Sequence, residues 1–66
     1  MRIVLNGAES ELDGTLADAV AAAAGDAERR GIAVALDGVV VPRGRWVETR
    51  LLEGQRVEVL EARQGG

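Results

Sequence analysis

Three stretches of the chain alternate with a period of two residues, which is the pattern of strands that bury one face; in the second stretch, larger aliphatic residues alternate with alanines. The stretches are Met1 to Asn6, Ile32 to Leu36 and Arg56 to Ala62. In the last of them, Val57 and Val59 would share one face of the strand. We therefore expect each stretch to form a strand of a sheet.

A turn signal follows each of the first two stretches. Asn6-Gly7 and Asp37-Gly38 are pairs that tolerate the positive φ angles of tight hairpin turns. Each pair predicts a return strand, over Ala8 to Leu12 at a polar sheet edge and over Val39 to Val41. Pro42 ends the second return strand or marks an edge, because proline cannot donate to a ladder.

The residues between the two predicted hairpins show the hydrophobic periodicity of a helix. Thr15 and Asp18 predict its start as a capping box, in which each side chain accepts a hydrogen bond from the other residue's backbone N–H. Gly25 is well placed to end the helix. The stripe expected to face the sheet recurs at intervals of three and four residues: Leu16, Ala19, Val20 and Ala23.

The segment from Arg43 to Arg50 matches neither period and receives no assignment. Trp46 within it is expected to close one end of a small core, since it is the largest side chain in the sequence. Leu51 and Leu52 are both expected in the core. Glu53-Gly54 predicts a turn before the last strand.

The predicted order of strand, strand, helix, strand, strand, strand indicates an α+β domain with the helix on one face of the sheet. The arrangement that fits is the ubiquitin-like β-grasp, a mixed sheet of four to five strands packed on one main helix. Its last strand would lie centrally, parallel to the first. We expect this domain to span residues 1–62 and residues 63–66 to form a flexible C-terminal tail.

The composition of this chain of 66 residues excludes most kinds of enzyme active site. It contains no Cys, His, Tyr or Lys, so triads, thiolates, Schiff bases and zinc sites lack their side chains. A net charge of −3 and a single aromatic residue argue against nucleic acid as a partner. No apolar run approaches the about 18–20 residues of a membrane span. We expect a cytoplasmic protein that holds no metal or cofactor and is not itself an enzyme.

The C-terminus is the remaining candidate for a reactive group, because composition excludes most reactive side chains. Arg63 and Gln64 lead into Gly65 and Gly66. Glycine has no Cβ, so a diglycine end fits a narrow slot in a partner. Four residues reach at most ~14 Å beyond a folded body, and adenylation by ATP would activate the terminal carboxylate. An incidental terminus is the alternative.

Six short segments follow one another along the chain in a defined order and spacing. They read I-V-L-N-G at residues 3–7, T-L-A-D at 15–18, A-V-A-L-D-G-V-V-V-P-R at 33–43, W-V-E-T-R-L-L-E-G at 46–54, V-E-V-L-E-A at 57–62, and Gly-Gly at the end. Together they resemble the ThiS family, the sulfur carriers of thiazole formation in thiamin biosynthesis. Asp37 stands where that family often has Asn, Gln55 where it often has Asp, and Gln64 where a small residue is common.

The resemblance implies a cycle carried at Gly66. An E1-like adenylyltransferase would use Mg-ATP to form the acyl-adenylate, and a sulfur donor such as a cysteine desulfurase would convert it to a thiocarboxylate. Thiazole synthase would then receive the sulfur, and the free carrier would be a monomer. Two alternatives stay open: a MoaD-like or other sulfur carrier of the same fold, and a β-grasp binding module that never reacts.

Partner contacts are expected at the tail and on the open face of the sheet. Gly65, Gln64 and Arg63 would serve tail recognition. If Val57 and Val59 face the helix, Leu60 faces the opposite side. The candidate partner patch there consists of Leu60, Val4 and Ala35.

Overall fold

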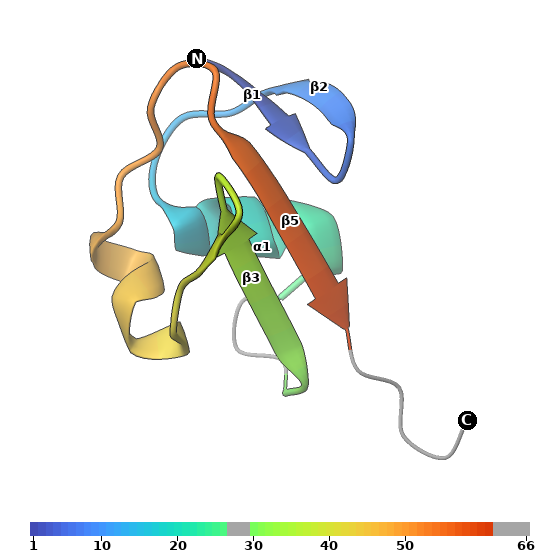
Figure 1. The fold of residues 1–66 in the computed structure, drawn as a ribbon, viewed down its shortest axis with the longest axis vertical. Helices are drawn as coiled ribbons and strands as arrows, with labels where there is room; N and C mark the ends of the chain where they lie inside the picture. The colour runs from blue at the N-terminus through green and yellow to red at the C-terminus, as the bar shows by residue number, and fades with distance from the viewer. Residues whose placement is uncertain (27–29, 62–66) are drawn as a thin grey trace.

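The computed structural model of the chain describes residues 1–26 and 30–61. These residues form a five-stranded mixed sheet with an α-helix packed on one face (Figure 1). In chain order the elements are β1 (Arg2–Leu5), β2 (Ala8–Glu11), α1 (Leu16–Ala24), β3 (Ile32–Leu36), β4 (Val39–Val40), the 3₁₀ helix η1 (Arg43–Glu48) and β5 (Arg56–Glu61).

The last strand lies in the middle of the sheet, whose order is β2-β1-β5-β3-β4. β5 runs parallel to β1 and antiparallel to β3. The predicted α+β, β-grasp architecture is therefore confirmed, including the long-range parallel pairing of the first and last strands. The boundary between a domain over 1–62 and a tail over 63–66 stays a prediction, because residues 62–66 lie outside the described residues.

Both hairpins turn at the predicted residue pairs. Asn6 and Gly7 have φ angles of 51° and 83°, and Asp37 and Gly38 have 49° and 85°. Asn and Asp are the side chains that best tolerate this left-handed region, so the sequence and the backbone agree. The second return strand is shorter than predicted, since β4 ends two residues before Pro42.

The helix begins and ends where the sequence indicates. The Asp18 carboxylate accepts hydrogen bonds from the Thr15 backbone N–H at 2.8 Å and from the Thr15 hydroxyl at 3.3 Å. Gly25 adopts a φ of 86°, and its N–H donates to the Ala21 carbonyl at 2.8 Å. The prediction that Ala23 faces the sheet is wrong: Ala23 is exposed, and Ala24, four residues after Val20, packs at the border of the core instead.

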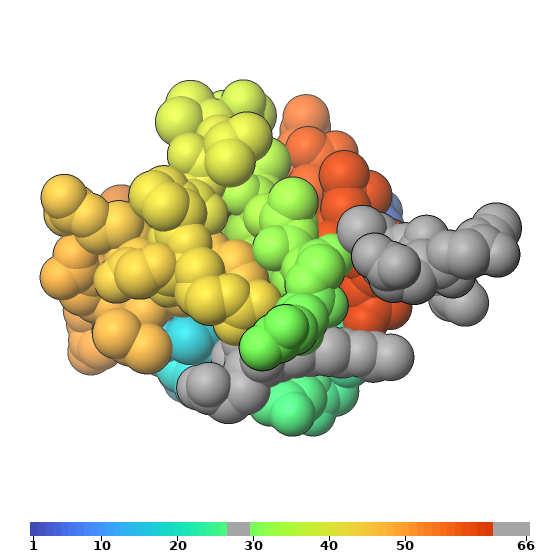
Figure 2. All heavy atoms as spheres, turned by 90° about the horizontal axis from the view of Figure 1, so that it is seen from below, coloured from blue at the N-terminus to red at the C-terminus, as the bar shows by residue number. Residues whose placement is uncertain are grey.

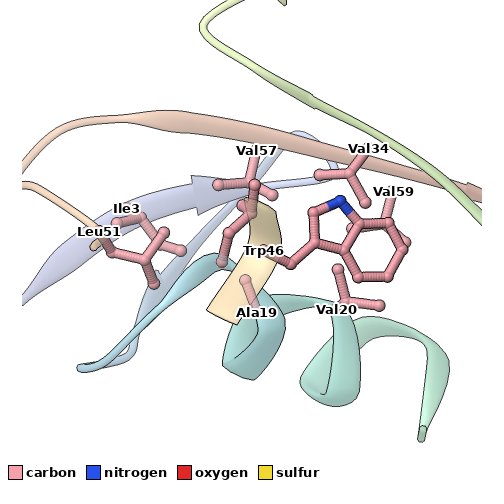
Figure 3. Close-up of a cluster of buried hydrophobic side chains, with 9 residues drawn as sticks. Ile3, Ala19, Val20, Val34, Trp46, Leu51, Val57 and Val59 are labelled. Carbon is pink, nitrogen blue, oxygen red and sulfur yellow. The ribbon is translucent and has the colours of Figure 1, made fainter. Parts of the chain in front are cut away.

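The core lies between α1 and the sheet and ends at Trp46, as predicted. In Figure 3 the indole ring lies beside Val20, Val34 and Val59, while Ile3 and Leu51 meet at the other end of the cluster. The indole N–H donates to the Val41 carbonyl at 2.9 Å, which satisfies the one polar atom of this buried ring.

The unassigned segment around Trp46 is the 3₁₀ helix η1, and it brings Leu51 but not Leu52 into the core. Leu51 is buried, whereas 60% of the surface of Leu52 is exposed, so the prediction for Leu52 is wrong. Successive residues of an extended segment point to opposite sides. The backbone N–H of Leu52 donates to the Gln55 side chain at 2.7 Å and starts the turn at Gly54.

Candidate functional site

In the sequence, the predicted reactive end of the chain follows β5, the central strand of the sheet. Residues 63–66, with Gly66, Gly65, Gln64 and Arg63, lie outside the described residues. The structure shows their base: β5 ends at Glu61, whose register partner is Ile32 at the start of β3. The amino end of the chain lies at the opposite end of β5, because the Gly54 N–H donates to the Arg2 carbonyl at 2.8 Å.

Two side chains from the hairpin turns hold the backbone of β5. Asn6 Oδ1 accepts the Val59 N–H at 2.7 Å, and Asp37 Oδ1 accepts the Arg56 N–H at 2.9 Å. The turn signals at Asn6 and Asp37 do not by themselves predict these contacts with β5. A signal for them was available, because Asn and Asp in a turn next to a neighbouring strand carry an acceptor that the turn itself does not use.

The open face of the sheet carries a shallow apolar hollow of about 140 Å³. Seen from the carboxyl end of β5, the residues of β3 lie between β5 and the segment from β4 into η1 (Figure 2). Register places Leu60 opposite Ala33 and Glu58 opposite Ala35, with Val40 on the far side of Ala35. The small alanines between larger neighbours create the hollow, whose lining residues are Ala33, Val34, Ala35, Val40, Glu58 and Leu60.

Two of the three predicted patch residues meet at this hollow. Leu60 and Ala35 both line it, and Leu60 exposes 69% of its surface. Val4 shares the open face but pairs with Arg56, four residues before Leu60 along β5. Val4 therefore lies apart from the hollow, and the surface brought together is an apolar hollow with the Glu58 carboxylate in its lining.

Charged side chains cover the other half of the open face. Arg2 forms ion pairs with Glu9 and Glu11, each at 3.5 Å. The α-amine of Met1 lies 3.0 Å from a Glu11 carboxylate oxygen and 2.9 Å from one of Asp13. Hydrogen bonds to these two carboxylates raise the pKa of the amine from 8.0 to about 10. The same bonds hold the pKa values of Glu11 and Asp13 below their ordinary range.

No group of three or more acidic side chains in residues 1–26 and 30–61 is arranged to hold a metal ion. Within the same part of the chain, no helix has the length and hydropathy needed to cross a membrane.

A model of the ThiS family matches residues 3–66, which is almost the entire sequence. The chain belongs to the ThiS family. The match runs through the diglycine end and includes every element described above except Arg2, the first residue of β1. A comparison with curated proteins finds no match.

A solved structure agrees with this family assignment. The chain resembles the crystal structure of the thiamine biosynthesis protein ThiS from Geobacter metallireducens, with a TM-score of 0.76 and 27% sequence identity over 100% of both chains. Membership of the ThiS family and this structural similarity support a role as a sulfur carrier in thiamin biosynthesis. Members of the family act as small carriers rather than as catalysts.

Proposed function

We propose that the chain carries sulfur on the C-terminal carboxylate of Gly66. The observation that carries this proposal is the family match, which extends through Gly65 and Gly66. The central position of β5 supports it, because the strand that precedes the reactive end is anchored on both sides by other strands. The chain would act as a recycled cosubstrate, and its partners would perform the catalysis.

The proposed cycle begins with an E1-like adenylyltransferase and Mg-ATP. The Gly66 carboxylate attacks the α-phosphorus of ATP, which releases pyrophosphate and leaves an acyl-adenylate. A cysteine desulfurase persulfide then displaces AMP, and a thiol reduces the resulting S–S bond to give the thiocarboxylate. Thiazole synthase takes the sulfur, and Gly66 returns to a carboxylate. No cofactor is bound to the carrier in this scheme.

Recognition of the tail depends on its small residues. Gly65 and Gly66 present no Cβ, so the carboxylate passes through a slot too narrow for other residues. Gln64 and Arg63 precede them in the sequence and would meet the mouth of that slot, where the Arg63 guanidinium would pair with an acidic side chain of the partner.

The apolar hollow is the surface that we propose for docking of the activating enzyme. Leu60, which lines the hollow, lies one residue before the end of β5 at Glu61. A partner bound at the hollow would therefore be close to the point from which the tail continues. Leu60 would be the apolar anchor, and the Glu58 carboxylate would select a basic side chain on the partner.

The first step is tested by ATP–pyrophosphate exchange with the E1-like enzyme of the same source. The wild-type chain should stimulate exchange, because adenylation is reversible. Deletion of Gly66, and extension of the chain by one alanine after Gly66, should each abolish the stimulation. Equal stimulation by all three chains would contradict the role of Gly66. No stimulation by the wild-type chain would also contradict the proposal and would favour a binding module that never reacts.

A further inference from the structure

The parallel ladder between β1 and β5 contains one rung made by a side chain. The Val4 N–H donates to the Gln55 carbonyl at 2.9 Å, and the Asn6 N–H donates to the Val57 carbonyl at 2.8 Å. In a regular parallel ladder the carbonyl of Asn6 would next accept the Val59 N–H. That N–H is instead bound at 2.7 Å by the side-chain oxygen of Asn6.

The backbone of Asn6 explains the exchange. Its φ of 51° turns the chain toward Gly7 and β2, so its main-chain carbonyl leaves the ladder. The Asn side chain carries a carbonyl of the same kind and continues the pairing by one rung. Asparagine combines two properties here: it tolerates positive φ, and it supplies a neutral acceptor of the right length.

This rung lies at the part of β5 that leads out of the sheet. Main-chain register with β1 ends at Val57, whereas register with β3 continues to Glu61. Beyond Val57, the side chain of Asn6 therefore replaces the main chain of β1 as the hydrogen-bond partner on that side of β5. Val59 is buried, so leaving its N–H without this acceptor would cost free energy of folding.

We propose that Asn6 is a positioning residue for the activation of Gly66. Its side-chain oxygen fixes the direction in which β5 leaves the sheet, and with it the point from which the terminal carboxylate is presented. This inference rests on the proposed function of Gly66. Docking on the hollow holds the two proteins together, whereas Asn6 affects the placement of the reacting atom, so the loss should appear in kcat rather than in KM.

The chain contains a matched control for this role. Asp37 has a φ of 49°, precedes a glycine of positive φ, and binds the backbone N–H of β5 at Arg56. It makes the same kind of bond from the same kind of turn, but at the start of β5. Asn6→Gly and Asp37→Gly each preserve a turn that glycine accepts and each remove one acceptor from β5.

The test combines amide hydrogen exchange with ATP–pyrophosphate exchange at varied carrier concentration. In N6G, exchange at Val59 should accelerate about fivefold, and kcat for activation should fall about fivefold with KM unchanged. D37G should accelerate exchange at Arg56 and keep the wild-type kcat. Asn6→Asp retains an acceptor and the tolerance of positive φ, so N6D should restore kcat. Circular dichroism and thermal melting of each variant establish that it is folded.

The outcomes separate the two proposals. If the wild-type chain is not adenylated, the proposed function fails and the positioning role falls with it. If the wild-type chain is adenylated and N6G matches D37G in kcat, the positioning role alone is overturned. An unchanged rate of amide hydrogen exchange at Val59 in N6G would overturn it as well, because the hydrogen bond from the Val59 N–H to the Asn6 side chain would then not stabilise this part of β5.

Discussion

At the scale of single residues, the α-amine of Met1 has an unusual environment for a chain terminus. Two carboxylates bind it on the charged half of the open face, and the sequence contains no Lys, Tyr or Cys. No other ordinary side chain of this protein therefore titrates between neutrality and the range of Arg. The effect of this one group can be isolated by pH alone.

Stability should decline in alkali through this amine. Its pKa is raised to about 10 in the folded chain from an ordinary value of 8.0, so its contribution is complete below about pH 8 and is lost as the pH rises through about 10. The lowered pKa values of Glu11 and Asp13 have the opposite sign, and their contribution is lost as the pH falls through the acid range. Thermal melting between about pH 7 and pH 11 measures the alkaline loss.

The control for this prediction is the same chain acetylated at the α-amine. Acetylation removes the titrating group and its ion pairs, so the melting temperature of the acetylated chain should stay constant over the alkaline range. A parallel decline in both chains would show that the Met1 ion pairs do not cause the loss.

At the scale of elements, the start of α1 depends on a glycine that lies next to the cap. Gly14 has a φ of 121°, and a Cβ at this position would collide with the Asp18 carboxylate, which accepts the Thr15 N–H. The cap and the bend that precedes it therefore form one structural unit. The main chain of Gly14 also contributes, because its carbonyl accepts the Leu51 N–H at 3.0 Å.

Gly14→Ala should destabilise the protein by about 2 kcal/mol, because it adds backbone strain and displaces the Asp18 side chain from the cap. Urea unfolding measures the change. Gly44→Ala is the matched control: a Cβ at Gly44 meets no atom within 4 Å, and the expected change is within about 0.5 kcal/mol. Similar losses in the two variants would mean that contact with Asp18 does not decide the effect.

The sequence predicts these elements well where a local rule decides them. The turns at Asn6 and Asp37 and the cap at Thr15 follow from the conformations that these side chains favour. Leu52 and Ala23 were assigned wrongly, because burial depends on which neighbour covers a side chain, and periodicity does not contain that information. The 3₁₀ helix η1 has no signal of its own; packing of Trp46 against the core holds it in place.

At the scale of the whole molecule, the sheet separates two kinds of surface. One face packs on α1, and the open face combines an apolar hollow around Leu60 with ion pairs around Arg2. The alternation of residues in β5 predicts that Leu60 points to the open face of the sheet. The hollow itself could not be predicted, because it requires Ala33, Ala35 and Val40 to meet across three strands.

Leu60→Ala should raise KM for the carrier in the activation reaction about tenfold, which is the size of a modest interface anchor. Its effect on folding stability should be small, since the side chain is largely exposed. Leu52→Ala is the matched control, as Leu52 is also an exposed leucine but does not line the hollow. An unchanged KM in L60A, or an equal rise in L52A, would contradict docking on the hollow.

Intact-mass spectrometry shows whether Gly66 carries the sulfur. The chain is incubated with its E1-like enzyme, Mg-ATP and sulfide, alongside the chain that lacks Gly66. The full chain should gain a mass equal to the replacement of one oxygen by one sulfur, and the shortened chain should gain none. An unchanged mass of the full chain, with an enzyme that converts another carrier under the same conditions, would contradict this role of Gly66.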